Sequence, residues 1–145
     1  MVLGTEGFTP GGAVYSTLEL DATNTPYVTY RDDAFSGKAT AKRFNGSSWV
    51  TLGSEGFSAG EIQDPNLLSD AQGTLYVVYS DASLGSKAIM KKFDPKSATW
   101  VTVGPEGFTT GIVTYLTFAM DRYGVPYVVF RDDTQGGKLT VMQYN

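Results

Sequence analysis

Three stretches of apolar residues that end abruptly in charge recur along the chain. The clearest is Pro26–Asp33, which reads Pro-Tyr-Val-Thr-Tyr-Arg-Asp-Asp; it returns in weaker form around Tyr76 and again as Pro126–Asp133. An aromatic and β-branched run that stops at charged residues predicts a strand entering a polar loop. Apolar residues nowhere keep a helical spacing over three turns, so we expect no long helix.

The same companions surround each of these stretches. Glu-Gly-Phe comes before it, an aspartate stands shortly before its tyrosine, and Lys38, Lys87 and Lys138 follow it at intervals of 49 and 51 residues. The second interval is longer by two residues, and these lie in the loop before Trp100. A period of about 20–50 residues indicates a solenoid, a propeller or an array of repeats.

Each period contains four predicted strands, which in the first copy cover residues 15–20, 27–31, 38–44 and 49–52. Short turn sequences between them favour antiparallel pairing. In the second and third copies the second strand is apolar on both faces, as in Tyr76–Tyr79. A strand covered on one face alternates, whereas a strand between two stacked sheets need not. We therefore expect four-stranded sheets packed face to face.

The unit resembles a β-propeller blade, and is most similar to NHL-like repeats in its inner strand, aspartate, glycine turn and Tyr-Val strand. The resemblance covers the whole chain. It implies an all-β fold with three four-stranded antiparallel blades per chain. It implies little about function, because propellers include lectins, scaffolds and enzymes.

The order of the strands within the repeat predicts how a ring would close. The start of the chain matches the outermost strand of a blade, and the last copy lacks that strand. Rings take about four to eight blades, so three blades need a partner. We expect a homodimer that forms a six-bladed ring, in which Val2 and Leu3 pair with residues 140–144 of the partner. A methionine at this cut also suggests an engineered or excised half-ring. The expected units are an outer strand that closes the partner's last blade (1–5), blade 1 (6–53), blade 2 (54–104) and blade 3 without its outer strand (105–145).

Composition narrows the range of partners. The formal charge is −4, and lysines and arginines are dispersed, so nucleic acid and anionic membranes are poor partners. The sequence has neither a membrane-spanning apolar run nor the features of a signal peptide, which leaves the location open. It contains no cysteine and no histidine, which excludes thiol and Ser-His-Asp nucleophiles and histidine-bound zinc. A calcium-loop motif is missing too. We expect no cofactor and no metal.

The loop between the second and third strands carries candidate ligand-binding residues. They form a charged rim that suits a glycan or another small polar ligand. The alternative is structural: Asp32, Asp81 and Asp132 accept N–H bonds in their own turns, and the cations pair between blades. Repetition in each unit favours the structural interpretation, which also applies to Asp21, Asp70 and Asp121 before their turns. The rim candidates are Arg31, Asp32, Asp33, Lys38, Arg131, Asp132, Asp133 and Lys138.

The inner strand of the second copy departs from the pattern. Glu61 and Asp64 stand there beside Pro65, a residue that an edge strand along a central channel tolerates. These carboxylates are either solvated residues around a wet channel or a ligand or cation site on its axis.

From these features we expect a self-assembling, non-catalytic module that binds or acts as a scaffold. The alternatives are a lectin-like propeller and a glycosidase-like enzyme that uses loop carboxylates. Neighbouring acidic residues such as Asp32 and Asp33 point in opposite directions on a strand end, which is poor geometry for such catalysis. Trp49 and Trp100 are expected to be largely buried.

Overall fold

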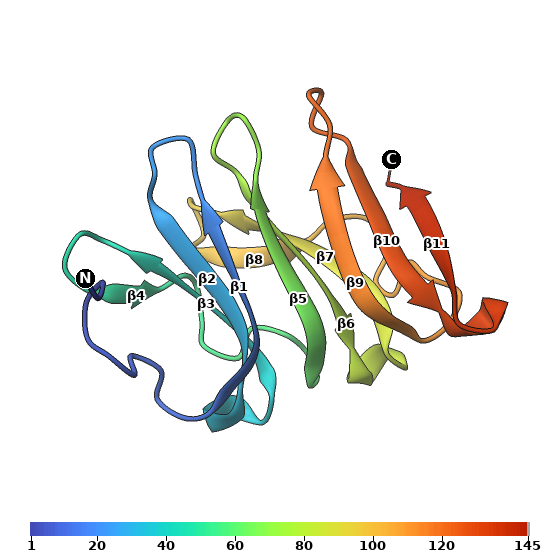
Figure 1. The fold of residues 1–145 in the computed structure, drawn as a ribbon, viewed down its shortest axis with the longest axis horizontal. Helices are drawn as coiled ribbons and strands as arrows, with labels where there is room; N and C mark the ends of the chain where they lie inside the picture. Colours follow the sequence, from blue (N-terminus) through green and yellow to red (C-terminus); the bar gives the residue numbers. More distant parts are fainter. Residues whose placement is uncertain (145) are drawn as a thin grey trace.

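The computed structural model describes residues 1–144, and Figure 1 shows three antiparallel sheets standing side by side. All three sheets follow chain order from the innermost strand outward. The first contains β1 (Ala13–Leu20), β2 (Pro26–Asp32), β3 (Lys38–Phe44) and β4 (Trp49–Thr51). The second contains β5 (Ile62–Ser69), β6 (Leu75–Asp81), β7 (Lys87–Asp94) and β8 (Thr99–Thr102). The third contains β9 (Val113–Met120), β10 (Pro126–Asp132) and β11 (Lys138–Gln143).

This arrangement confirms the predicted repeat. Each unit has the expected inner, second and third strands, and the third sheet has no fourth strand within residues 1–144. The end of the third predicted blade, Asn145, lies outside the described residues. The aspartates before the first hairpin of each unit are turn residues, as predicted. Asp21 Oδ1, for example, accepts from the backbone N–H groups of Thr23 at 2.8 Å and Thr25 at 2.9 Å.

Two apolar layers hold the sheets together. The first lies between the first and second sheets, where Val77 and Tyr79 face Ala39 and Ala41. The second lies between the second and third sheets and contains Val78 from the opposite side of β6. The middle strand β6 is thus covered on both faces, which explains its continuous apolar sequence.

The innermost strands β1, β5 and β9 share an irregularity. Tyr15, Asp64 and Tyr115 occupy the same position in their strands, and each has a left-handed φ, of 51°, 49° and 52° respectively. The strand register shifts at each of these places, as in a β-bulge. A bulge turns side chains away from the regular alternation of a strand, so these three positions are directed differently from their neighbours.

The structure distinguishes the two tryptophans. Trp100 is buried, as predicted, and its Nε1 donates to Leu52 O at 3.0 Å between neighbouring sheets. Trp49 is only half-buried in the single chain, which departs from the prediction. Its Nε1 donates to Leu3 O at 3.0 Å, and its ring stacks on Phe8. Residues 1–5, predicted to complete a partner's blade, form no strand in the single chain.

Candidate functional site

The polar residues predicted as a site gather at one end of the three sheets, where short 3₁₀ helices connect the second and third strands. These helices are η1 (Asp33–Phe35), η2 (Ala82–Leu84) and η3 (Asp133–Gln135). The bulges of the inner strands lie at the same end, because Val14, next to Tyr15, pairs with Arg31 just before η1. This end is the lower one in Figure 1.

The repeated aspartates of this end are structural. Asp32, Asp81 and Asp132 are buried, and each caps its 3₁₀ helix by accepting a backbone N–H bond two residues on. The carboxylate of Asp81 also accepts from Gly60 N at 3.3 Å. The Thr134 hydroxyl donates to Asp132, and this bond is the main reason that the pKa of Asp132 is below its ordinary value. For Asp32 and Asp132 these contacts agree with the structural alternative to the predicted ligand rim.

A second group of rim residues forms an ion-pair cluster. Arg31 Nη1 contacts Glu61 Oε1 at 2.7 Å, and Arg31 Nε lies 3.4 Å from Asp33 Oδ1. The second contact is an ion pair without hydrogen-bond geometry, because the buried Nε has no hydrogen-bond partner. Glu61 comes from the second sheet and the other two residues from the first. The predicted pairing of cations between blades is thus observed here.

The third sheet reproduces this cluster only in part. Arg131 Nη1 lies 3.4 Å from Asp133 Oδ1, and no residue from a following sheet joins them within residues 1–144. Lys38 and Lys138, also predicted for the rim, make no salt bridge among the described residues. The structure therefore brings Arg31, Asp33 and Glu61 together and pairs Arg131 with Asp133, while Lys38 and Lys138 join neither group.

The inner strands line a small, open axial pocket at the same end of the sheets. Its volume is about 210 Å³, and β1, β5 and β9 all contribute to it. Asp64, the residue at the bulge of β5, lies in its wall. The lining residues are Tyr15, Ser16, Thr17, Asp64, Pro65, Asn66 and Leu116.

Side chains of β5 connect the inner strands around this pocket. Asp64 Oδ2 accepts from Tyr115 N at 2.6 Å, and Asn66 Nδ2 donates to Leu116 O at 2.6 Å. Thr117 Oγ1 in turn donates to Asn66 Oδ1 at 3.1 Å. Asp64 is thus held in place rather than only solvated, and no cation lies within salt-bridge distance of it among the described residues.

Two aromatic residues at the bulges were missed by reasoning from the sequence. Tyr15 and Tyr115 are exposed, and they stand at the strand positions that correspond to Asp64. Exposed tyrosines beside a carboxylate and an amide form a surface on which a sugar ring can stack and make hydrogen bonds. The only signal in the sequence was the recurrence of tyrosine in two copies of the inner strand, which also suits a strand core.

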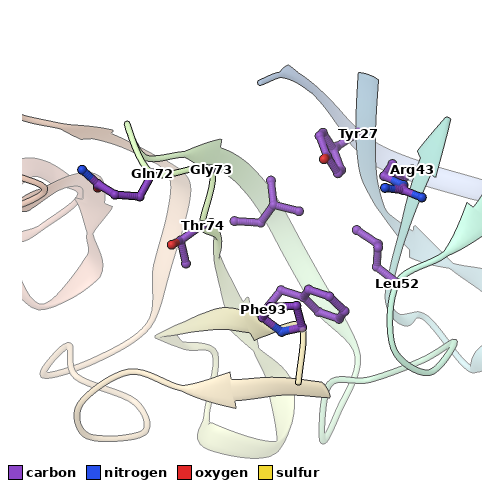
Figure 2. A pocket seen from close by; sticks show the side chains of 9 residues that line it. Tyr27, Arg43, Leu52, Gln72, Gly73, Thr74 and Phe93 are labelled. Carbon is purple, nitrogen blue, oxygen red and sulfur yellow. The ribbon is translucent and has the colours of Figure 1, made fainter. Parts of the chain in front are cut away.

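A more apolar hollow lies at the other end of the sheets. Figure 2 shows this pocket of about 290 Å³ between Tyr27 and Leu52 of the first sheet and Phe93 of the second. A pocket with corresponding residues, including Tyr76 and Val103, lies between the second and third sheets. Because it recurs between successive sheets, we interpret it as a packing feature of the repeat.

Two features are absent from the part of the chain that the structure describes. No group of three or more acidic residues there is arranged to hold a metal ion. No helix in residues 1–144 is long and apolar enough to cross a membrane.

Comparisons with known proteins support the fold. No protein-family model and no curated protein matches the chain. Among solved structures, the endo-arabinase from Bacteroides thetaiotaomicron VPI-5482 matches 95% of this chain with a TM-score of 0.59 and 14% identity. The chain spans 58% of the length of that protein. A GH43 endo-arabinanase from Bacillus licheniformis matches 88% of this chain and 52% of its own, with a TM-score of 0.48 and 13% identity.

The fold is that of a β-propeller, with three antiparallel blades in this chain. Nothing among the similar structures supports the specific likeness to NHL repeats. They also correct the expectation of a non-catalytic scaffold, because the matched propeller is an enzyme. The glycosidase-like alternative agrees with this finding better.

Proposed function

We propose that this chain is part of a carbohydrate-active propeller of the glycoside hydrolase type. The supporting observation is that Asp64 lines the axial pocket, while Glu61, three residues before it in the chain, pairs with Arg31, which also lies beside Asp33. Both carboxylates occur only in the second blade, so the requirements of the repeat do not explain them. The substrate class is a polysaccharide such as arabinan, the substrate named for the similar enzyme.

Hydrolysis of a glycosidic bond needs two carboxyl groups separated by about 5–9 Å. Three residues of a strand span at most about 10 Å, and the bulge at Asp64 shortens the path from Glu61. The two carboxylates have different surroundings. Glu61 is paired with a guanidinium, whereas Asp64 has no cation beside it and accepts a backbone N–H bond from Tyr115. Tyr15 would stack on the sugar.

A second candidate is a lectin-like propeller that binds glycans without hydrolysing them. The observation in its favour is that Tyr15 lines the same pocket, and that Tyr115, which is also exposed, donates its backbone N–H to Asp64 there. In that case the Asp64 carboxylate and the Asn66 amide would only accept and donate hydrogen bonds to sugar hydroxyls.

Measuring reducing ends released from linear arabinan, xylan and galactan separates the two candidates. We expect release from one of these polymers, reduced by about 10²–10⁴ in Glu61→Gln and in Asp64→Asn, the usual contribution of general acid–base catalysis. Glu106→Gln, at an exposed repeated carboxylate, is the matched control and should retain the rate.

Calorimetric binding of arabino-oligosaccharides completes the test. Binding that is abolished by Tyr15→Ala, with no release of reducing ends from any polymer, would replace the hydrolase with the lectin. Neither turnover nor binding would contradict both candidates. The proposed ring of six blades, made of two chains, has a separate structural basis.

A further inference from the structure

Residues 1–144 contain two packed interfaces between blades and two faces without a neighbouring blade. We call the free side of blade 3, with Tyr127, Leu139 and Val141, the trailing face. The free side of blade 1, with Ala13 and Leu18, is the leading face. Leu139 is 74% exposed, Val141 65% and Leu18 63%. So many exposed aliphatic side chains on strands indicate surfaces that are normally covered.

The same positions are buried wherever a neighbouring blade is present. The residues that correspond to Leu139 and Val141 are Ala39 and Ala41 in blade 1, and both are fully buried in the first apolar layer. The residue that corresponds to Leu18 in blade 2 is Leu67, which is buried in the same layer. The two free faces are thus the two halves of a third interface of the same kind.

In the closed interfaces one position pairs a small residue on the trailing side with a large residue on the leading side. On the two free faces the large residue is on the trailing side and the small one on the leading side. Ala39 shares its buried layer with Ile62, and in the next interface another alanine shares its layer with Val113. On the free faces, however, the trailing residue is Leu139 and the leading residue is Ala13. Cores tolerate exchanges that conserve total volume, so a large trailing residue suits a small leading one. This trailing face therefore matches the leading face of this same sequence.

Backbone groups on the two faces also correspond to bonded groups in the closed interface. Phe57 N donates to Ala39 O at 2.8 Å, and Ile62 N donates to Gly37 O at 2.9 Å. Their equivalents on the leading face are the N–H groups of Phe8 and Ala13. The equivalent acceptors are the carbonyl groups of residues 139 and 137 on the trailing face.

A threonine hydroxyl on the leading face already has the orientation seen in the closed interfaces. Ser58 Oγ donates to Gly60 O at 2.7 Å and accepts from Ala39 N at 2.9 Å. Thr9 Oγ1 likewise donates to Gly11 O at 2.8 Å. Its oxygen can therefore accept a second bond, and the equivalent donor is the N–H of residue 139 on a trailing face.

The first residues of the chain lie where the outer strand of a preceding blade would end. Leu3 O accepts from Trp49 Nε1 just as Leu52 O accepts from Trp100 Nε1, both at 3.0 Å. Phe8 stacks on Trp49 with centroids 4.7 Å apart, and Phe57 on Trp100 at 4.9 Å. Residues 1–5 are thus placed to pair with β11 of another blade 3, which has a free edge.

From these correspondences we infer that the trailing face of one chain docks on the leading face of a second copy, and that two such contacts close a six-bladed ring. In this ring residues 1–5 of each chain form the fourth strand of the other chain's blade 3. Six inner strands then surround the axis, so the second copy completes the wall of the axial pocket. The inference does not depend on the proposed hydrolytic activity.

Light scattering on a chromatographic peak tests the inference directly. We expect twice the chain mass of 15.6 kDa at micromolar concentration. A charge on either face should give the single-chain mass, so Leu18→Asp and Leu139→Lys are each expected to be monomeric. Both side chains are exposed in the single chain, so neither change should unfold a blade. Tyr123→Asp, at an exposed turn aromatic away from both faces, is the matched control and should remain dimeric.

Mixing the two monomeric variants identifies the faces that meet. A mixed dimer has one unchanged contact and one contact that carries both substitutions, a carboxylate on its leading face and an ammonium group on its trailing face, so at least one of its two contacts is intact. We therefore expect the Leu18→Asp and Leu139→Lys chains, once mixed, to recover the double mass. A wild-type chain that is a monomer, or a mixture that stays monomeric, would overturn the inference. A mass other than that of two chains would overturn the six-bladed ring and show a ring of a different size.

Discussion

Two kinds of carboxylate lie at the same end of the propeller, and they differ in how often the repeat uses them. Asp32, Asp81 and Asp132 occur in each blade, are buried and cap their 3₁₀ helices. Glu61 and Asp64 occur in one blade only; Asp64 lines an open pocket, and Glu61 pairs with Arg31 of the neighbouring blade. In a repeat protein, therefore, a residue that returns in each unit belongs to the fold. The exception to the repeat indicates the candidate site.

The largest loss of stability should follow the substitution of a repeated apolar residue. Trp100→Ala removes a buried ring that stacks on Phe57 and donates to Leu52 O, so we expect a loss of about 3–5 kcal/mol of unfolding free energy. Urea denaturation followed by circular dichroism measures this loss. Tyr123→Ala, an exposed aromatic, should cost much less and is the control. Equal losses in the two variants would contradict the structural role of Trp100.

The second-largest loss of stability should follow the substitution of a repeated aspartate. Asp81→Ala removes the cap of η2 and the acceptor for Gly60 N in a buried place, so we expect a loss of roughly 2–3 kcal/mol. The same denaturation experiment measures it, with Asp94→Ala at an exposed turn as the control. A cost for Asp81→Ala below that of the control would show that repetition is not a sign of structural need.

The turn aspartate Asp21 should produce a smaller, pH-dependent effect. The Thr23 hydroxyl and the backbone N–H groups of Thr25 and Thr23 lower the pKa of Asp21 to about 2. Because the folded-state pKa is below the unfolded one, of about 4, this stabilisation is complete above pH 4 and is lost as the pH falls toward 2. Thermal melting from pH 6 to pH 2 should therefore fall less steeply in Asp21→Ala than in the wild type. Parallel curves would exclude this contribution.

The smallest effect on stability should come from the residue that is unique to blade 2. Glu61→Gln removes an exposed ion pair with Arg31, and such pairs contribute about 0–1 kcal/mol. We expect thermal melting within a degree or two of the wild type, whatever happens to activity. A loss as large as that of Asp81→Ala would show that Glu61 is a structural residue and would weaken the comparison.

Most of the fold could be predicted from the sequence, because the recurring residues align the three copies and thereby locate each strand. The strand Lys38–Phe44 was predicted with its observed bounds, and the capping and turn roles of the aspartates followed from their repetition. The half-burial of Trp49 could not be foreseen in the same way. Trp49 stands at the repeat position of the buried Trp100, but the exposure of a residue in an end blade depends on whether a neighbouring blade covers it.

The site was less predictable for a different reason. The bulges at Tyr15, Asp64 and Tyr115 arise from left-handed backbone conformations that tyrosine rarely adopts, so residue type gave no indication of them. The association of Glu61 with Arg31 joins residues of different blades, and a linear pattern does not reveal such contacts. The expectation that no glycosidase chemistry takes place rested on the poor geometry of adjacent acidic residues such as Asp32 and Asp33, and it did not weigh carboxylates that lie further apart, such as Glu61 and Asp64.

The burial of β6 determines which parts of the molecule unfold locally and which only with the whole chain. Six of its seven residues are buried, and its tyrosine Tyr79 is so thoroughly desolvated that burial raises its pKa above the ordinary value. The last strand, β11, is by contrast mostly exposed. Amide hydrogens in β6 should consequently exchange with deuterium only when the whole chain unfolds, and those of β11 through local fraying. In the single chain, protection should therefore decrease from the middle blade toward both ends.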